Sequence, residues 1–287
     1  MAHRGCLHAG RRKFRTMSCP GSDTYPASRR HTAITGKQQR SVSSSSSYAV
    51  PKTPTPTLSV LGSDERFPVR RVYCVGSNYR AHALEMGGNP DKDPPFFFTK
   101  PPDAAVDVSA GSATVVHYPP ETQDLQHEVE MVVAIGKGGR GISPQRALQH
   151  VFAYGVGVDL TRRDMQRVAK KAGRPWDCSK GFDGSGPIGA LTPAAGDGSG
   201  AGDDSRDIWL KVDGVLRQKS VLGDMVWSVP EMIARLSQLF TLEPGDVLFT
   251  GTPSGVAPLK IGETVEAGVD GLEPCRFEVA PTLPPWS

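Results

Sequence analysis

The sequence predicts an α+β fold in which β-strands dominate and helices are few and short. Short apolar segments rich in β-branched residues outnumber the segments with helical periodicity. The 287 residues include 32 Gly and 25 Pro, which are typical of the turns that connect strands. Strands and helices do not alternate regularly, and the pattern therefore disfavours a sheet built from repeated strand–helix–strand units.

The individual elements are expected from residue 69 onward. Gly76 is expected to end the first strand, and Ser143 followed by Pro144 marks a helix start, because proline is favoured in a first helical turn. The pair Asp213–Gly214 between two strand-like segments predicts a hairpin with a type I′ turn. Strands are expected within residues 70–79, 94–102, 127–136, 153–160, 208–212, 215–219, 245–253, 263–268 and 275–280, and helices within 80–88, 143–151, 161–173 and 229–240.

Net charge separates residues 1–46 from the rest of the chain. They contain nine Lys or Arg and one acid, Asp23, a charge of +8, so the overall charge of +3 leaves −5 for the remainder. No basic run outside this segment resembles a nucleic-acid-binding surface. No segment reaches the ~18 consecutive apolar residues of a membrane-spanning helix. We therefore expect neither nucleic acid nor a membrane as a partner.

Three regions are expected along the chain. Residues 1–46 are rich in Arg and Ser, lack an apolar period and are expected to be a disordered extension. This composition also fits a transit peptide, which would make the protein mitochondrial, whereas a tail or an over-extended start site would leave it cytoplasmic. Residues 47–68 contain repeated prolines and are expected to form an extended arm. Residues 69–282 are expected to form a single catalytic domain.

Five cysteines are scattered without a Cys-x-x-Cys pair: Cys6, Cys19, Cys74, Cys178 and Cys275. This spacing excludes a zinc ribbon and argues against a disulfide framework, so a reducing compartment is expected. Cys74 and Cys275 lie in apolar runs and are interpreted as small core residues.

Two carboxylates mark the clearest candidate site. Side chains on a strand alternate between its faces, so Glu128 and Glu130 are expected on one side of the segment HEVEMVVAIG. Neighbouring like charges on an apolar strand favour a hard cation such as Mg²⁺, Mn²⁺ or Ca²⁺ between them. The alternative is an edge strand with one solvated polar face. Asp159, at the end of another apolar strand, is a third candidate ligand; its alternative role is to cap the helix that begins near residue 161.

Further polar side chains lie where they could serve the same site. His82 and Glu85 are one helical turn apart, the spacing of a general-base pair, although most such pairs are surface neighbours. Lys180 lies in a glycine-rich stretch between Trp176 and Phe182, without helical periodicity, and is either a solvated lysine or a buried ammonium that needs an anion.

Two more segments carry polar side chains that could contact a ligand. Arg163 and Gln166 begin the helix beyond Asp159 and are expected to face the same cavity. Thr250 and Thr252 lie in a Gly-rich turn after a strand, which resembles an anion-binding loop but lacks the ending of a nucleotide P-loop.

Together these segments resemble the fumarylacetoacetate hydrolase family. The matching motifs are VYCVGSNYRAHALEMG, PFFFTKP, QHEVEMVVAIGKGG, GVGVDLTRRDMQRVAKKAGRPWDCSKGFDGSGPIG, WLKVDGVLRQ and GDVLFTGTPSGV, in the family's order, over roughly residues 69–280. Within the family the chain is most similar to the bacterial-type fumarylpyruvate hydrolases. The resemblance implies the family's C-terminal-domain fold, with mixed sheets rolled around a metal site, and a homodimer.

The resemblance also implies roles for individual residues. Glu128, Glu130 and Asp159 fall on the family's Mg²⁺ or Mn²⁺ ligands. The remaining matches are the active-site lysine at Lys180, the catalytic lid pair His82 and Glu85, and the substrate contacts Arg163, Gln166 and Thr252.

The implied reaction is hydrolysis of a carbon–carbon bond in a 2,4-diketo acid, with 3-fumarylpyruvate giving fumarate and pyruvate, as in gentisate-type aromatic degradation. Acylpyruvate hydrolysis, oxaloacetate decarboxylation, a 4-oxalocrotonate-type decarboxylase and a related isomerase stay open as alternatives, as does a non-catalytic binding protein on the same scaffold.

Overall fold

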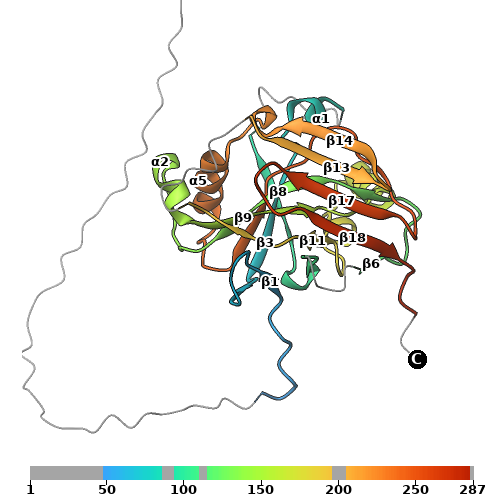
Figure 1. Ribbon diagram of the computed structural model, residues 1–287, viewed down its shortest axis with the longest axis horizontal. Helices are drawn as coiled ribbons and strands as arrows, with labels where there is room; N and C mark the ends of the chain where they lie inside the picture. Colours follow the sequence, from blue (N-terminus) through green and yellow to red (C-terminus); the bar gives the residue numbers. More distant parts are fainter. Residues whose placement is uncertain (1–47, 86–93, 110–114, 196–204, 285–287) are drawn as a thin grey trace, which may run out of the picture. The chain divides into compact units, whose positions relative to one another are not determined.

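The computed structural model describes residues 48–85, 94–109, 115–195 and 205–284, with the backbone alone for Ala83 and Glu85. The chain divides into a unit Met1–Pro51 and a unit Lys52–Ser287. The strands and helices below belong to the second unit (Figure 1). The prediction for residues 1–46 lies outside the described residues.

The strands of the described segments form four sheets. The largest has the order β4 (Phe96–Lys100), β3 (Arg71–Gly76), β15 (Asp246–Phe249), β8 (Val129–Ile135), β9 (Val151–Val158), β11 (Gly186–Ile188) and β5 (Ala105–Asp107), with β12 (Thr192–Pro193) paired to β9. The second has the order β14 (Val215–Val221), β13 (Asp207–Val212), β17 (Thr264–Val269), β18 (Cys275–Ala280) and β6 (Val115–His117). The smaller sheets are β10 (Thr161–Arg162), β7 (Leu125–His127) and β16 (Ala257–Pro258), and the pair β1 (Thr57–Ser59) and β2 (Arg66–Pro68).

The helices are short, as the sequence predicts. They are α1 (Arg80–Glu85), α2 (Pro144–Ala147), α3 (Arg163–Ala172), α4 (Asp177–Lys180) and α5 (Val229–Leu239), with the 3₁₀ turns η1 (Pro102–Ala104), η2 (Leu148–His150) and η3 (Leu222–Asp224). None of the helices in these segments has the length and apolar character needed to cross a membrane. The predicted β-dominated α+β class is confirmed.

Strand β8 is buried on both faces and lies between β15 and β9. Val129, Met131 and Val133 face a core shared with the second sheet, whereas Val132 and Ala134 face a separate apolar cluster. The alternative interpretation of this segment as an edge strand with a solvated face is therefore wrong. The predicted single strand is also interrupted: β7 ends at His127 and β8 begins at Val129, so Glu128 lies at the junction.

The predicted hairpin joins β13 to β14, which lie side by side with β17 and β18 (Figure 1). Asp213 and Gly214 both have positive φ, 49° and 75°. Positive φ at both central residues is the requirement of a type I′ turn, so the turn chemistry is confirmed.

The proline-rich segment before residue 69 contributes two strands to the structure. β1 and β2 pair antiparallel, and Leu58 faces Phe67 in register. Both side chains are buried, at 0% and 6% exposure. Arg66 and Ser59 contact the Asp107 carboxylate at 2.5 and 2.7 Å, which ties this pair of strands to β5.

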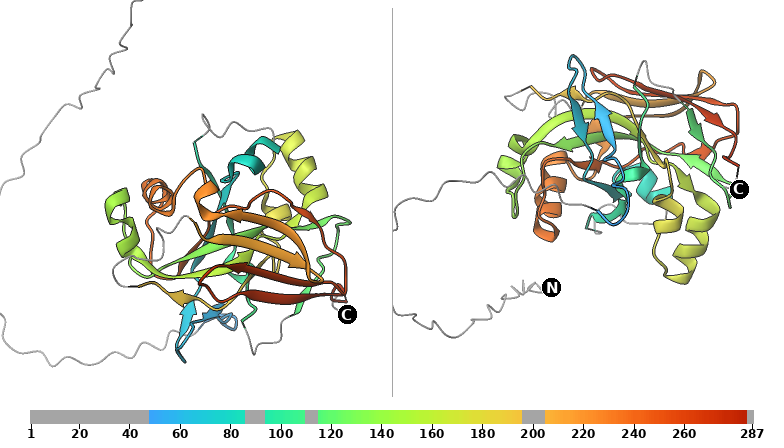
Figure 2. Two further views of the ribbon diagram at one scale, coloured as in Figure 1. Left: turned by 45° about the horizontal axis from the view of Figure 1, so that its top comes forward. Right: turned by 90° about the horizontal axis from the view of Figure 1, so that it is seen from below.

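Two elements differ from the predictions. The stretch around Lys180 forms the one-turn helix α4, which sequence periodicity does not reveal because four residues are too few to show it. Asp159 does not cap α3, because the residue at the N-cap is Arg162. Helix α3 stands out from the sheets (Figure 2), and its buried residues are Arg163 and Gln166, both in its first turn.

Asn78 joins the loop after β3 to two distant segments. Its side chain is fully buried; Nδ2 donates to the carbonyls of Thr250 and Trp227 at 2.7 and 3.0 Å, and Oδ1 accepts from Trp227 N at 2.8 Å. Asn78→Ala leaves these three backbone groups, of which the carbonyl of Thr250 is buried, without their partner, so we expect it to lower the free energy of unfolding by about 3 kcal/mol. Urea denaturation measures this loss. Gln238→Ala, which truncates an exposed amide, is the control, and equal effects of the two substitutions would contradict the prediction.

Candidate active site

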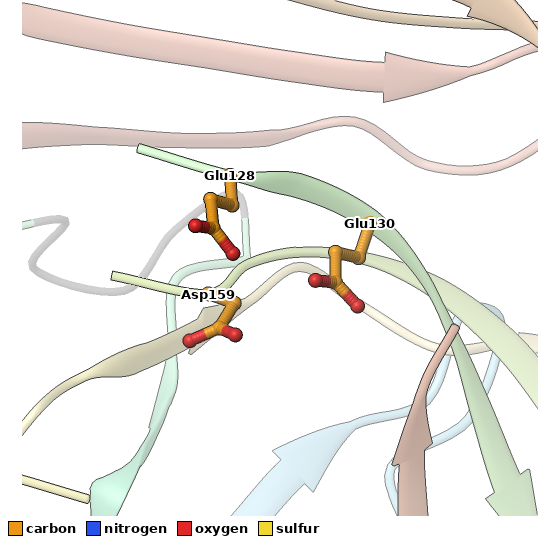
Figure 3. A group of neighbouring side chains, drawn as sticks. All are labelled: Glu128, Glu130 and Asp159. Carbon is orange, nitrogen blue, oxygen red and sulfur yellow. The ribbon is translucent and has the colours of Figure 1, made fainter. Parts of the chain in front are cut away.

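Three buried carboxylates converge at the ends of β8 and β9. Glu128, Glu130 and Asp159 are 5%, 2% and 1% exposed, and each offers an oxygen within 4.8 Å of the others. Glu128 and Glu130 extend to the same side of their segment and face Asp159 (Figure 3). Asp159 N donates to the carbonyl of Glu128 at 2.8 Å, which fixes the two backbones next to each other. The same-face expectation is thus confirmed, and Asp159 joins the pair.

Cations surround this acidic group. Lys180 Nζ lies 2.7 Å from both Glu128 Oε2 and Asp159 Oδ2. Arg163 Nη2 contacts the other oxygen of Glu128. Lys100 Nζ lies 2.9 Å from Asp159 Oδ1, with a side chain that is 0% exposed. Three carboxylates therefore face three buried cations among the described residues.

Lys100 is a site residue that sequence reasoning missed. It is the last residue of β4 and lies between Thr99 and Pro101, a setting that gives no functional signal. Its ammonium also donates to Ser185 Oγ at 3.0 Å and to the carbonyl of Lys180. It therefore connects Asp159 to the C-terminal end of α4, the helix that carries Lys180.

The buried position of Lys180 is set by α4. The backbone N–H groups of Ser179 and Lys180 donate to the carbonyl of Trp176, which begins the turn. The ammonium lies 5.3 Å from the centre of the Phe98 ring. Burial alone would lower the pKa of Lys180, but the charges of Asp159 and Glu128 outweigh it and raise this pKa above its usual value. Lys180 is therefore a cation at neutral pH, and the solvated alternative is wrong.

The two glutamates have opposite electrostatic environments. Burial would raise the pKa of Glu128, but Lys180, Arg163 and His82 lower it well below its usual value. Glu130 forms no ion pair with any described residue and accepts a hydrogen bond from Gly251 N. Burial and the charges of Asp159 and Glu128 raise the pKa of Glu130. Glu130 is thus the carboxylate with the greatest need of a further cation.

The donor set fits a hard divalent metal ion. All three candidate ligands are carboxylates, the type preferred by Mg²⁺ and Mn²⁺. They are buried and close together, so their mutual repulsion is unfavourable unless a positive charge joins them. Glu128, Glu130 and Asp159 would hold such an ion, with Lys180 and Arg163 beside it.

The raised pKa of Glu130 predicts that metal binding releases a proton. Below this pKa the metal-free carboxyl stays protonated, so the apparent Mn²⁺ affinity should rise about tenfold per pH unit as pH increases toward it. The metal-free protein should lose stability as pH rises through this pKa, because the folded state then carries an unfavourable charge. Calorimetric titration with Mn²⁺ in buffers that differ in their heat of ionisation measures the number of protons released when the metal binds. An Mn²⁺ affinity that does not change as the pH rises above the usual pKa of a glutamate would contradict this assignment.

The remaining predicted residues on α1 and α3 differ in how closely they approach the carboxylates. Arg163 is hydrogen-bonded to Gln126 Oε1 at 2.8 Å and to Gln166 Oε1 at 2.5 Å, and its contact with Glu128 places the first turn of α3 beside the carboxylates. That Arg163 and Gln166 contact a substrate stays a prediction. His82 is buried on α1, close enough to the carboxylates to be one of the groups that lower the pKa of Glu128. The side chain of Glu85 lies outside the described residues, so its pairing with His82 stays a prediction.

The loop after β15 is closely tied to the same site. Gly251 donates its N–H to Glu130, and its φ of +96° favours glycine. A Cβ at Gly251 would also lie 2.6 Å from that of Asn78. The hydroxyl of Thr250 donates to the carbonyl of Met131 at 2.9 Å, whereas that of Thr252 accepts from Gln218 Nε2 at 2.8 Å. Thr252 is therefore placed next to the residue that contacts Glu130.

Comparison with known proteins agrees with this geometry. The family profile described as the fumarylacetoacetate (FAA) hydrolase C-terminal domain matches residues 71–280. Among solved structures, a fumarylpyruvate hydrolase from Pseudomonas aeruginosa, in complex with Mn²⁺ and pyruvate, is 47% identical in sequence. The structural match covers 82% of this chain and 99% of the Pseudomonas aeruginosa chain, with a TM-score of 0.77.

Curated relatives carry other activities. A mitochondrial oxaloacetate tautomerase of Arabidopsis thaliana is 38% identical over 217 residues, which are 76% of this chain and 94% of that protein. A mitochondrial oxaloacetate decarboxylase of Dictyostelium discoideum is 38% identical over 209 residues, 71% of this chain and 90% of that protein. Motif order, fold and extent of similarity agree, and the chain therefore belongs to the fumarylacetoacetate hydrolase family.

Proposed function

We propose that this protein hydrolyses the carbon–carbon bond of a 2,4-diketo acid and that 3-fumarylpyruvate is its substrate. The observation that carries the proposal is the buried group Glu128, Glu130 and Asp159 with its surrounding cations. An acidic group that holds a divalent ion, next to Lys180 and Arg163, suits a substrate with two carboxylates and two keto oxygens. The similarity to a fumarylpyruvate hydrolase that binds Mn²⁺ and pyruvate supports this choice.

The proposed reaction adds water across one carbon–carbon bond. His82 accepts a proton from water, oriented by Glu85, and the resulting hydroxide attacks the C4 carbonyl carbon. The C3–C4 bond then breaks, and its electron pair stays on the three-carbon fragment as the enolate of pyruvate. Protonation at C3 gives pyruvate, and the acyl fragment leaves as fumarate.

Other side chains serve charge and orientation in this proposal. Lys180 stays an ammonium at neutral pH and stabilises negative charge that develops on the reacting carbonyl. Arg163, Gln166 and Thr252 hold the substrate carboxylates. A bound Mg²⁺ or Mn²⁺ would supply Lewis-acid polarisation of the 2-keto group and charge stabilisation of the pyruvate half.

A second candidate function rests on the curated relatives. Oxaloacetate shares the 2-keto carboxylate of fumarylpyruvate and also gives a pyruvate enolate when it loses CO₂. The relatives named for oxaloacetate tautomerisation and decarboxylation are each 38% identical, below the 47% of the fumarylpyruvate hydrolase, which favours the diketo acid. A non-catalytic binding protein is disfavoured, because its site would not need Lys180 or the three carboxylates together.

A comparison of three substrates tests the proposal. Purified protein is assayed with fumarylpyruvate, acetylpyruvate and oxaloacetate, each with Mg²⁺, with Mn²⁺ and with chelator. We expect the highest kcat/KM for fumarylpyruvate, with fumarate and pyruvate formed in equal amounts and no turnover in chelator. Preference for oxaloacetate would replace the proposal with the second function, and inactivity on all three would support the binding protein.

We also propose that residues 69–282 act as the catalytic domain, since His82, the carboxylates and Thr252 all lie within them. A homodimer and a transit peptide in residues 1–46 are further proposals. Light scattering tests the first, and mass spectrometry of the native N-terminus tests the second.

A further inference from the structure

Strand β14 buries a polar residue where its neighbours are exposed. Val215 and Leu216 are 53% and 50% exposed, whereas Gln218 is 1% exposed. A strand that turns apolar side chains outward and an amide inward is unusual, because burial of an amide is unfavourable unless its hydrogen bonds are replaced. Gln218 belongs to the hairpin motif WLKVDGVLRQ, to which the proposed reaction assigns no role.

All hydrogen-bonding groups of the Gln218 amide are used. Oε1 accepts from Val129 N at 3.1 Å and contacts His127 Nδ1 at 2.8 Å. Nε2 donates to Pro253 O at 2.9 Å and to Thr252 Oγ1 at 2.8 Å. Two of these four partners are backbone groups of fixed polarity, an N–H and a carbonyl. The orientation of the amide is therefore determined by the backbone and cannot be reversed.

The orientation of the Gln218 amide decides whether the Thr252 hydroxyl accepts or donates in their hydrogen bond. Since Nε2 is the donor, Thr252 Oγ1 must accept from Gln218, and its own proton is directed elsewhere. No described residue accepts that proton. The contrast is Thr250, two residues earlier, whose hydroxyl donates to the carbonyl of Met131 at 2.9 Å. Of these two threonines, Thr252 is therefore the one that can donate to a ligand.

The loop that carries Thr252 is packed directly on β14. A Cβ at Gly255 would lie 2.3 Å from the carbonyl oxygen of Arg217, so glycine is required for this close approach. On the other side, Gly251 N contacts Glu130, and Val129 N, held by Gln218, lies between the two metal-site glutamates in sequence. Gln218 thus joins the loop to the strand that bears the carboxylates.

We propose that Gln218 is a positioning residue which fixes the Thr252 hydroxyl as a hydrogen-bond donor toward a carboxylate of the substrate. The inference rests on the proposed function, because it takes a 2-keto carboxylate as the ligand. It adds a residue that touches no substrate and acts through Thr252. Loss of Gln218 should raise KM more than it lowers kcat, since the bond it supports is made in the ground state as well as in the transition state.

The test is a double-mutant cycle on the Mn²⁺-loaded protein with pyruvate as the probe. Gln218→Met removes both polar ends at similar volume, so the Thr252 hydroxyl loses the donor that fixes the direction of its proton. We expect the pyruvate Kd to rise about 10- to 30-fold, the loss of one hydrogen bond to a charged group. In a Thr252→Val background the same substitution should change the pyruvate Kd less than about twofold, because the hydroxyl through which Gln218 acts is already absent. Lys219→Met, an exposed neighbour on β14, is the matched control with no expected effect.

The outcomes separate this inference from the function on which it rests. A pyruvate Kd that is unchanged by Gln218→Met, or that rises equally in the Thr252→Val background, overturns the positioning role. Failure of the unsubstituted protein to bind pyruvate overturns the proposed function and the inference with it. If Gln218→Met does not fold, Gln218→Asn, which keeps the amide but shortens its reach, replaces it with the same expected direction. Mn²⁺ affinity, measured separately, should stay within about threefold, whereas a structural role would weaken it together with pyruvate.

Discussion

Replacing Glu130 with glutamine should remove divalent-metal binding and turnover together. Glu130 is the site carboxylate without a cationic partner among the described residues, and burial and two neighbouring carboxylates raise its pKa. Loss of its charge removes a ligand where the cation is most needed. We expect kcat/KM to fall by at least about 10³-fold, since metal-ion catalysis supplies several kcal/mol.

The same substitution should leave the metal-free protein as stable as before, or more so. The glutamine oxygen still accepts from Gly251 N, and a glutamine cannot ionise next to Glu128 and Asp159. Thermal melting with and without Mn²⁺ measures both effects: the melting temperature without metal stays level or rises, and the metal-induced increase disappears. Glu278→Gln, on an exposed position of β18, is the control. A retained metal-induced increase would show that the ion binds elsewhere.

Lys180→Met should lower turnover by about 10³-fold while metal binding persists. The ammonium lies 2.7 Å from two metal-site carboxylates, and their charges raise its pKa, so it supplies a fixed positive charge at neutral pH. Its removal takes away charge stabilisation but no ligand. Because a cation next to the metal ligands is lost, the Mn²⁺ affinity should not decrease. This separates the role of Lys180 from that of Glu130.

Steady-state kinetics and Mn²⁺ titration on the same preparation check this prediction. Lys219→Met removes a lysine whose ammonium lies 2.7 Å from Asp207 on the surface, and it should change neither quantity, because exposed ion pairs contribute little. If Lys180→Met weakens Mn²⁺ binding as strongly as it lowers turnover, Lys180 maintains the site instead of taking part in the reaction.

The carboxylates could be predicted from the sequence because their relation is local. Side chains alternate along a strand, which places Glu128 and Glu130 on one side. The position of Asp159 at the end of an apolar strand identifies it as a third candidate ligand. Such arguments need only neighbouring residues and the alternation of a strand. The same holds for the hairpin at Asp213–Gly214, whose turn type follows from two residues.

One cationic partner of these carboxylates, Lys100, could not be predicted from the residues alone. Lys100 resembles an ordinary lysine at the end of a strand, and its contact with Asp159 depends on how β4 and β9 are placed in one sheet. Helix α4 is a single turn, so no periodicity reveals it. The link between Gln218 and Thr252 requires two separate sheets and a loop to meet, which involves residues 34 positions apart.

Anomalous diffraction from crystals grown with Mn²⁺ and pyruvate tests the central assignment most directly. We expect an anomalous peak at ligand distance, about 2.1 Å, from one oxygen each of Glu128, Glu130 and Asp159, with pyruvate density at the same ion. A peak bound to other residues, or pyruvate bound away from the ion, would contradict it.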